Sequence, residues 1–198
     1  MRNRSSVLEL AVLGLLHGAP MHGYELRKRL NEMLGLLRPF SYGSLYPCLK
    51  ALESKGAITA SQTLDEQTYG TARRGRIVYQ LTPQGTSLLE DLLGEAGPAS
   101  WEDENFDVRF ALFAQTDADT RVRVLEGRRI RMAERLDSLY TAIARSRPAD
   151  PYTAELQRHS VDQLEREVRW LEGLIDAERA ARRARQNVQP RSLPNPTR

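Results

Sequence analysis

Hydroxyl, phenol and amine side chains gather on one short stretch of the chain. This stretch contributes Ser41, Tyr42, Gly43, Ser44, Tyr46 and Lys50. Hydroxyl and amine groups bind phosphates and base edges, the N-terminus of a helix favours phosphate, and a glycine lets a backbone approach DNA closely. We therefore predict that these residues contact DNA. In the alternative interpretation, Ser41 is only a helix N-cap and Tyr46 packs in the core.

A second set of candidate DNA contacts lies further along the chain. Arg73, Arg74 and Arg76 flank Gly75, and three guanidinium groups beside a glycine suit phosphates or the minor groove. The alternative is a solvated surface, as is usual for a run of charges. Tyr24 is a further candidate, because it lies at the start of the second expected helix, where a helix-turn-helix crosses the DNA backbone, although its ring could also have a packing role.

The residue types that usually carry catalysis are not arranged for it. His17, His22 and His159 lack metal-type spacing with Cys48 or with carboxylates, and no P-loop, G-x-G-x-x-G or G-x-S-x-G motif occurs. We expect no enzymatic activity, no metal and no cofactor. Cys48 is the only cysteine, and we interpret it as a small apolar residue rather than a redox switch. Together with the lack of a signal peptide or a membrane-spanning run, this predicts a cytoplasmic protein.

Hydrophobic periodicity predicts the elements that must position these side chains. Three helices and then two strands are expected, over about residues 5–18, 22–36, 43–55, 57–62 and 76–81. Leu45, Leu49 and Leu52 form the inward stripe of the third helix, so the polar residues of that helix should face outward. The two strands form a hairpin, after which Thr82 as N-cap and Pro83 at the first helical position open a fourth helix.

The rear half is expected to be helical and to pair. The helices predicted here cover about residues 102–114, 116–145 and 152–183. The two long ones repeat apolar residues at alternating steps of three and four, which is a heptad seam, with Arg129 inside it. A single pair of such helices buries only part of its apolar surface, which favours a second protomer. The predicted dimerisation residues are Val122, Leu125, Met132, Leu136, Leu139, Ile143, Val161, Leu164, Val168, Leu171 and Ile175.

These patterns predict a mainly α fold with a small β-hairpin. Residues 1–93 should form a winged helix-turn-helix, residues 94–183 an antiparallel helical dimerisation domain, and residues 184–198 a disordered tail. The charge agrees with this division, because residues 1–83 carry 11 Lys and Arg against 6 Asp and Glu, whereas residues 84–183 carry 15 against 20. A basic front part beside an acidic rear part suggests a polyanionic partner for the front alone.

Four motifs in the front half narrow the family. They read LGLL at residues 13–16, PMHGYEL at 20–26, SYGSLYP at 41–47 and YQLTPQG at 79–85. In this order and spacing the set resembles the PadR family of bacterial regulators, and DENF at 103–106 with RWL at 169–171 resembles its longer subtype. The resemblance implies a winged helix that binds DNA, a phosphate contact by Tyr24, and helices that dimerise. The wing tip at residues 64–75 is long and departs from the family pattern.

The sequence therefore predicts a homodimeric repressor that binds double-stranded DNA at an inverted-repeat operator and is released by a small-molecule effector. Trp101 and Trp170 could line an effector pocket between the two halves, or could serve packing alone. The rival hypothesis is a protein-interaction module in which a winged helix and a coiled arm assemble partners without specific DNA binding. A DNA-binding repressor needs basic recognition and wing surfaces on one face, and a protein-binding module does not.

Overall fold

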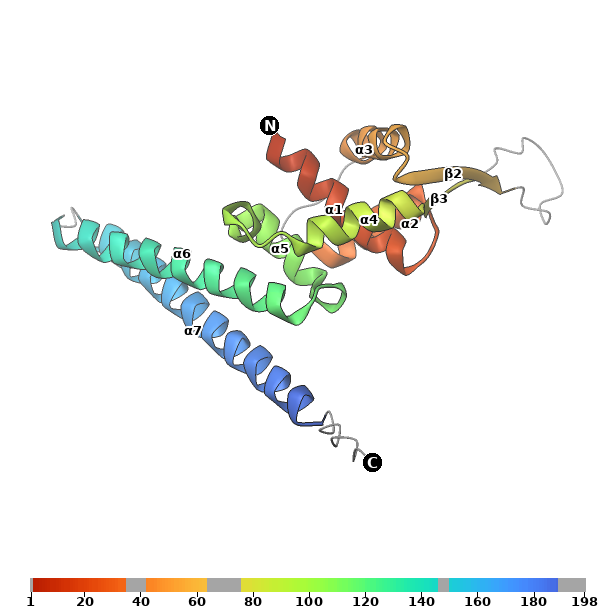
Figure 1. Cartoon of the computed structure of the whole chain (residues 1–198). Helices are drawn as coiled ribbons and strands as arrows, with labels where there is room; N and C mark the ends of the chain where they lie inside the picture. The colour runs from red at the N-terminus through yellow and green to blue at the C-terminus, as the bar shows by residue number, and fades with distance from the viewer. Residues whose placement is uncertain (1, 35–41, 64–75, 146–149, 189–198) are drawn as a thin grey trace, which may run out of the picture. The chain divides into compact units, whose positions relative to one another are not determined.

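The computed structural model describes residues 2–34, 42–63, 76–145 and 150–188, and it divides into two units at residues 117 and 118 (Figure 1). The first unit holds a bundle of helices and a small sheet, and the second is a pair of long helices. The elements of the first unit are α1 (Arg2–Gly18), β1 (Met21–His22), α2 (Gly23–Leu34), α3 (Tyr42–Ser54), β2 (Ile58–Thr63), β3 (Arg76–Leu81), α4 (Pro83–Gly94), η1 (Pro98–Trp101), α5 (Asp103–Ala111) and η2 (Phe113–Gln115).

Leucines from three helices form the centre of the first unit. The side chains of Leu13 in α1, Leu26 and Leu30 in α2, and Leu45 and Leu52 in α3 are completely buried. Since α1 is apolar on nearly every side, it is enclosed by α2, α3, α4 and α5, as the sequence predicts. The inward leucine stripe of α3 is confirmed, and it leaves the opposite face of that helix at the surface.

The sheet has three strands in the order β1-β3-β2, so the predicted hairpin is only part of it. β2 and β3 are antiparallel, with Ile58 opposite Leu81. β1 pairs with the other edge of β3, with Met21 opposite Tyr79. The sequence interpretation places His22 at the start of a helix, and this is wrong: His22 lies in β1, and α2 begins at Gly23. The sheet and the helices that precede it form a winged helix (Figure 1).

The junction between α3, β2 and α4 depends on Gly56 and Thr82. Gly56 has a φ of 69°, which ends α3, and the amide of Ala57 donates to the Leu52 carbonyl at 2.9 Å. The Thr82 hydroxyl donates to the Gly56 carbonyl at 2.6 Å and accepts from the Gly85 amide at 3.0 Å. The predicted helix end and N-cap are both confirmed, and together they tie the start of α4 to the base of the hairpin.

The first unit extends beyond α4, because α5 packs on α1 and α2. Val108 and Leu112 belong to the same buried cluster as the leucines of α1. A Cβ atom built at Gly14 of α1 would lie 2.5 Å from Leu112 Cδ2, so the two segments touch closely. The predicted domain boundary at residues 93 and 94 assigns this segment to the rear half, whereas the compact unit runs to Asp117.

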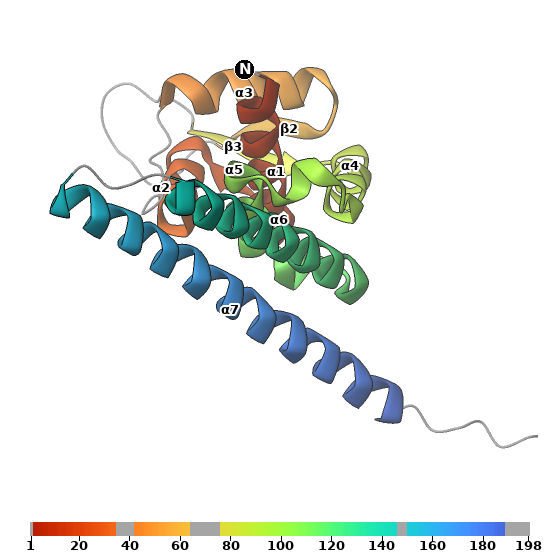
Figure 2. The same cartoon turned by 90° about the vertical axis from the view of Figure 1, so that its left-hand side faces the viewer.

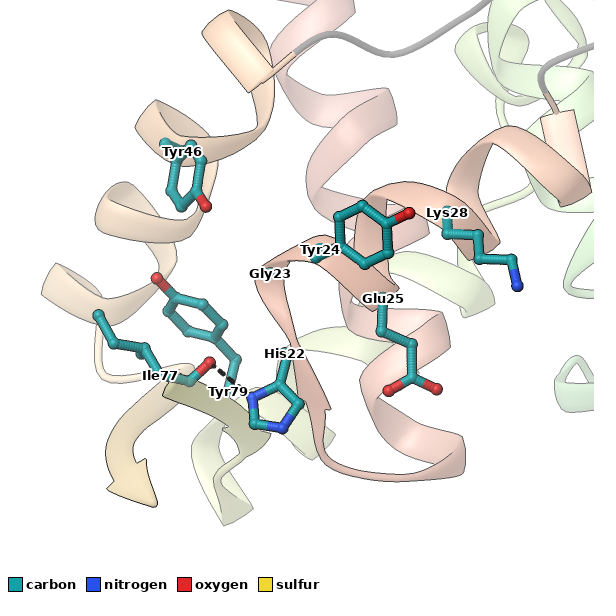
Figure 3. Close-up of a pocket in the computed structure, with 8 residues that line it drawn as sticks. All are labelled: His22, Gly23, Tyr24, Glu25, Lys28, Tyr46, Ile77 and Tyr79. Carbon is teal, nitrogen blue, oxygen red and sulfur yellow. Dashed lines mark hydrogen bonds between the residues drawn. The ribbon is translucent and has the colours of Figure 1, made fainter. Parts of the chain in front are cut away.

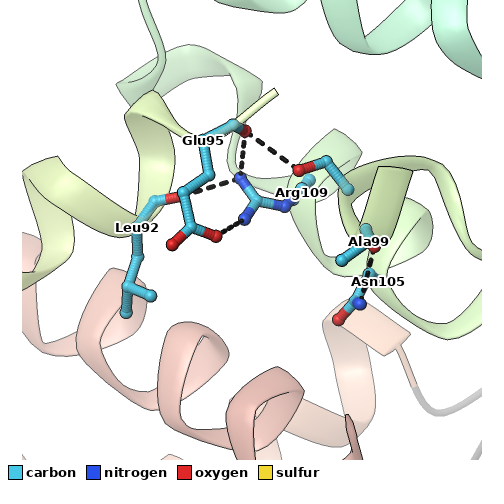
Figure 4. A network of polar contacts seen from close by, with 6 residues as sticks. Leu92, Glu95, Ala99, Asn105 and Arg109 are labelled. Atoms are coloured by element: carbon cyan, nitrogen blue, oxygen red, sulfur yellow. Dashed lines mark hydrogen bonds and ion pairs between the residues drawn. The ribbon is translucent and has the colours of Figure 1, made fainter. Parts of the chain in front are cut away.

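A buried arginine fastens the segment between α4 and α5 (Figure 4). Arg109 Nη1 donates to the carbonyls of Leu92 at 2.8 Å and Glu95 at 3.0 Å, and its Nη2 pairs with the Glu95 carboxylate at 3.1 Å. Asn105 Nδ2 donates to the Ala99 carbonyl at 2.7 Å. These bonds satisfy carbonyls at the end of α4 and hold the intervening turn in place.

The second unit is an antiparallel pair formed by α6 (Ala118–Arg145) and α7 (Pro151–Val188), which lie side by side in both views (Figures 1 and 2). Both long helices are confirmed. The helix at residues 184–188 contradicts the prediction that a disordered tail begins at 184, while residues 189–198 lie outside the described residues. Among the described residues, no helix combines the length and apolarity needed to cross a membrane.

Ion pairs join the two helices of this pair. Arg121 pairs with Glu178 at 2.7 Å, and Arg128 Nε and Nη2 donate to Glu167 Oε1 at 2.9 and 2.7 Å. The sequence places Arg129 in the seam, but Arg128 is the buried arginine, with only 7% of its surface exposed. The neighbouring Arg129 is only partly buried.

The predicted dimerisation residues lie on α6 and α7, the two helices that pack together within one chain. Leu125, Met132, Leu171 and Ile175 are fully buried there. The rest are only partly buried, namely Val122, Leu136, Leu139, Ile143, Val161, Leu164 and Val168. Their role between protomers stays a prediction.

The close approach of α4 to the hairpin predicts a stability effect. A Cβ atom at Gly85 would lie 1.9 Å from the Ala57 carbonyl oxygen, so Gly85→Ala should force the backbone apart and lower the free energy of unfolding by about 2–3 kcal/mol. Gly94→Ala is the matched control, since no described atom lies within 4 Å of that Cβ, and it should be neutral or stabilise by about 0.5–1 kcal/mol. Urea unfolding followed by circular dichroism measures both, and equal stabilities would contradict the packing described.

Candidate nucleic-acid interface

The outward face of α3 carries most of the residues predicted to contact DNA. Gly43, Ser44, Tyr46 and Lys50 are all exposed on this helix. Tyr46 keeps 49% of its surface, which contradicts the alternative that it packs in the core. This face can offer hydroxyl and ammonium groups, the groups that bind base edges and phosphates in a DNA groove.

The start of α2 lies beside α3 and adds a second tyrosine. Tyr24 is 65% exposed, which contradicts the alternative that its ring packs in the interior. A Cβ atom at the neighbouring Gly23 would lie 3.4 Å from the Tyr46 hydroxyl, so the start of α2 and the middle of α3 approach closely. Tyr24 and Tyr46 therefore belong to one surface although they are distant in the sequence.

An open hollow of about 760 Å³ lies on this surface, between α2, α3 and β3 (Figure 3). Its lining residues are His22, Gly23, Tyr24, Glu25, Lys28, Tyr46, Ile77 and Tyr79. Sequence reasoning identified only two of these as candidate contacts. Lys28 lies one helical turn after Tyr24, so their shared face could have been found from the spacing. Tyr79 and Ile77 could not, because a strand distant in the sequence brings them there.

The hollow combines the hydroxyls of three tyrosines with one lysine and one glutamate. Burial raises the pKa of Tyr79 above its ordinary value, and the nearby Tyr46 and Glu53 raise it further. The phenol of Tyr79 therefore stays protonated. Nδ1 of His22 lies 3.3 Å from the Ile77 carbonyl, which fastens the ring to β3 (Figure 3). Glu25 is paired with Arg29 at 3.0 Å, which offsets the carboxylate on this surface. Phenol hydroxyls and an ammonium group can donate hydrogen bonds to phosphate oxygens.

The remaining predicted DNA contacts are described in part or not at all. Ser41, Arg73 and Arg74 lie outside the described residues. Tyr42 is the first residue of α3 and Arg76 the first of β3, and only their backbone is described. The contribution of the wing arginines therefore stays a prediction.

The two tryptophans of the predicted effector pocket belong to different units. Trp101 ends η1 in the first unit and is partly buried. Trp170 lies on α7 in the second unit and keeps 45% of its surface exposed. The effector pocket stays a prediction.

The described part of the chain contains no group of three His, Cys, Asp or Glu side chains that could hold a metal ion. Cys48 is buried on the inward side of α3. Burial, followed by the nearby Glu9 carboxylate, raises the pKa of its thiol to about 12. A thiol in that state is not a nucleophile, since the thiolate is the reactive form.

Comparison with known proteins decides the family. The family model described as the transcriptional regulator PadR-like family matches residues 12–91, which hold α2, α3, the hairpin strands and most of α4. The winged-helix part of the chain, residues 12–91, therefore belongs to this family. The resemblance drawn from the four sequence motifs is thereby confirmed, and with it a function in regulating transcription.

Relatives of this PadR-like chain include the negative transcriptional regulator PadR of Bacillus subtilis (strain 168). It is 28% identical over 179 residues, which are 85% of this chain and 96% of the relative. Among solved structures, Bacillus subtilis PadR in complex with operator DNA is 22% identical, with 85% of this chain and 97% of that chain covered and a TM-score of 0.42. The putative transcriptional regulator TA0346 from Thermoplasma acidophilum is 30% identical over 46% of this chain and 81% of that chain, with a TM-score of 0.40.

The burial of Cys48 predicts an unreactive thiol. With a pKa of about 12, only about one thiol in ten thousand is ionised at pH 8. A disulfide reagent such as Ellman's reagent should therefore label the native protein very slowly, and should label one thiol per chain at once in denaturant. Rapid stoichiometric labelling of the folded protein would contradict the burial of this residue and reopen a redox role.

Proposed function

We propose that this PadR-like regulator is a homodimeric repressor that binds an inverted-repeat operator through α3. The exposed hydroxyl and lysine face of α3, opposite three buried leucines, is the observation that carries the proposal. The negative regulator from Bacillus subtilis, related over most of its length, supports repression rather than activation. As a DNA-binding regulator we place it in the cytoplasm, with no enzymatic activity of its own.

In this proposal, α3 enters the major groove and α2 holds the backbone. Ser44, Tyr46 and Lys50 face base edges, as do Tyr42 and Gly43 at the start of the helix. Tyr24 donates its hydroxyl to a phosphate beside the hollow, and Lys28 adds a charge there. Ser41 and the wing arginines Arg73, Arg74 and Arg76 complete the contact, the arginines on phosphates or in the minor groove.

The dimer we propose is a four-helix bundle made from two α6–α7 pairs. One pair leaves most of its seam residues only partly buried, so a second pair would complete their burial. The outer faces also expose large apolar side chains, with Ile130 on α6 at 50% and Leu156 on α7 at 65%. Such exposure on both helices of a narrow pair is typical of a surface that a second copy covers.

We also propose that a small molecule releases the DNA. A symmetric dimer fills two half-sites together only at one spacing of its two winged helices, so a ligand that changes this spacing lowers operator affinity. Trp101 and Trp170 are the proposed lining of its pocket. A ligand that lowers operator affinity should change tryptophan fluorescence at the same concentration, since both tryptophans would contact it.

The DNA proposal predicts different effects at two positions. The operator is first found by footprinting the DNA upstream of the protein's own gene. Ser44→Ala should then lose about 1–3 kcal/mol of preference for the operator over a scrambled duplex, because a base contact is removed. Tyr24→Phe removes only a phosphate contact, so its affinity should fall equally on both duplexes. Ser54→Ala, at the far end of α3, is the matched control and should change neither.

Two results would contradict this assignment. If Ser44→Ala lowers binding to operator and scrambled DNA by the same factor, α3 is not the element that reads the bases. If the wild type shows no preference for any duplex, and its binding does not weaken as salt rises, the protein-interaction module becomes the better hypothesis.

The dimer proposal predicts a particle of about 45 kDa, twice the 22.5 kDa of one chain. Ile130→Glu should raise the dissociation constant of the dimer at least about tenfold, because a carboxylate would be buried in the interface. Ala142→Glu, at an exposed position about 120° around the same helix from Ile130, is the control and should leave it unchanged. Sedimentation equilibrium measures all three, and a wild-type mass of 22.5 kDa at micromolar concentration would overturn the dimer.

A further inference from the structure

The second unit ends in a helix that extends past its partner. Arg182 Nη1 pairs with Asp119 Oδ1 at 2.8 Å, and Asp119 is the second residue of α6. Because the two helices are antiparallel, the residues of α7 after Arg182 lie beyond the start of α6. α7 nevertheless continues to Val188, so its last described residues extend past the end of α6.

Arginines concentrate where this extension begins. They are Arg179, Arg182, Arg183 and Arg185, and no Asp or Glu occurs from residue 179 to 198. At about 100° per residue, the four side chains lie within about 160° of the helix circumference. They therefore share one side of α7.

Elsewhere along the helix pair, arginines of one helix form ion pairs with carboxylates of the other. Arg121 and Arg128 on α6 are paired with carboxylates of α7. Arg179 and Arg182 pair in turn with the last carboxylates that α6 can offer, at Glu126 and Asp119. Arg183 and Arg185 follow these pairs and are exposed, so the positive potential of the helix end is not cancelled.

The helix macrodipole accounts for part of this pattern. A cation in the last turn of a helix is stabilised by about 0.3–1 kcal/mol, and one or two arginines would suffice for that. It does not require four arginines on one side with no acidic residue after them. A cluster of positive charges without acidic neighbours is typical of a surface that binds a polyanion.

We propose that the basic end of α7, formed by Arg179, Arg182, Arg183 and Arg185, binds the phosphate backbone of duplex DNA that flanks the operator. Guanidinium groups bind phosphate oxygens in a bidentate manner, and each neutralised phosphate releases condensed counterions. This contact is independent of sequence and extends the binding site beyond the base pairs that α3 reads. It rests on the proposed function, because duplex DNA is the polyanion that the first unit brings to the dimer.

The test compares two duplexes, one that ends at the operator and one with ten extra random base pairs on each side. The wild type should bind the longer duplex several-fold more tightly. R183Q/R185Q should abolish this gain while keeping its affinity for the short duplex, since these two arginines follow the last ion pairs between α7 and α6. On the longer duplex, the slope of log affinity against log salt should fall by about 0.9 for each phosphate that the variant no longer binds.

Two controls separate this contact from a general effect of charge. R145Q/R158Q removes the same net charge at the opposite end of the helix pair and should keep the gain, as should R183K/R185K. Equal affinity of the wild type for both duplexes would overturn the proposal while operator binding stands. An equal loss in R145Q/R158Q would overturn it as well. Failure of the wild type to bind the short duplex would instead contradict the proposed function itself.

Discussion

The burial of the leucine stripe of α3 is the constraint on which the first unit depends. Leu45, Leu49 and Leu52 are fully buried, and burying each contributes about 1.5–3 kcal/mol. A surface hydroxyl or lysine contributes far less to folding, so the core decides how α3 is rotated about its axis. Ser44 and Lys50 are at the surface because they lie opposite these leucines. The face of α3 that we propose to contact DNA is therefore the face that core packing leaves exposed.

Helices of three or more turns could be predicted from the sequence, because each repeats its apolar positions several times. β1 could not, since two residues show no period and Met21 is held only by pairing with Tyr79 on β3. The same reasoning limits the site. Tyr24 and Tyr46 follow from the exposed faces of their own helices, whereas Tyr79 reaches the hollow through the sheet. Local patterns predict which face is exposed, but not which distant segment lies beside it.

The rear half shows what a heptad pattern leaves open. The pattern correctly predicts two pairing helices, but it does not say whether the partner helix comes from the same chain. Most residues of the predicted seam are partly buried within one chain. This is compatible with pairing inside the chain and with pairing between two chains. The buried arginine is displaced by one residue from the prediction, and one residue turns a helix by about 100°. A strict seven-residue repeat places Arg129 in the seam. In the structure its neighbour Arg128 occupies that buried position and pairs with Glu167.

The position of α5 determines where the joint between the two units lies. The glycine and proline residues after α4 resemble a flexible linker, yet Arg109 bonds the Leu92 and Glu95 carbonyls across this turn. Removing such a buried, paired guanidinium leaves carbonyls unsatisfied, which costs about 1–3 kcal/mol for each group. The turn is therefore fixed within the first unit. The covalent joint between the units therefore lies near residues 116–118, after η2, and not in the turn that follows α4.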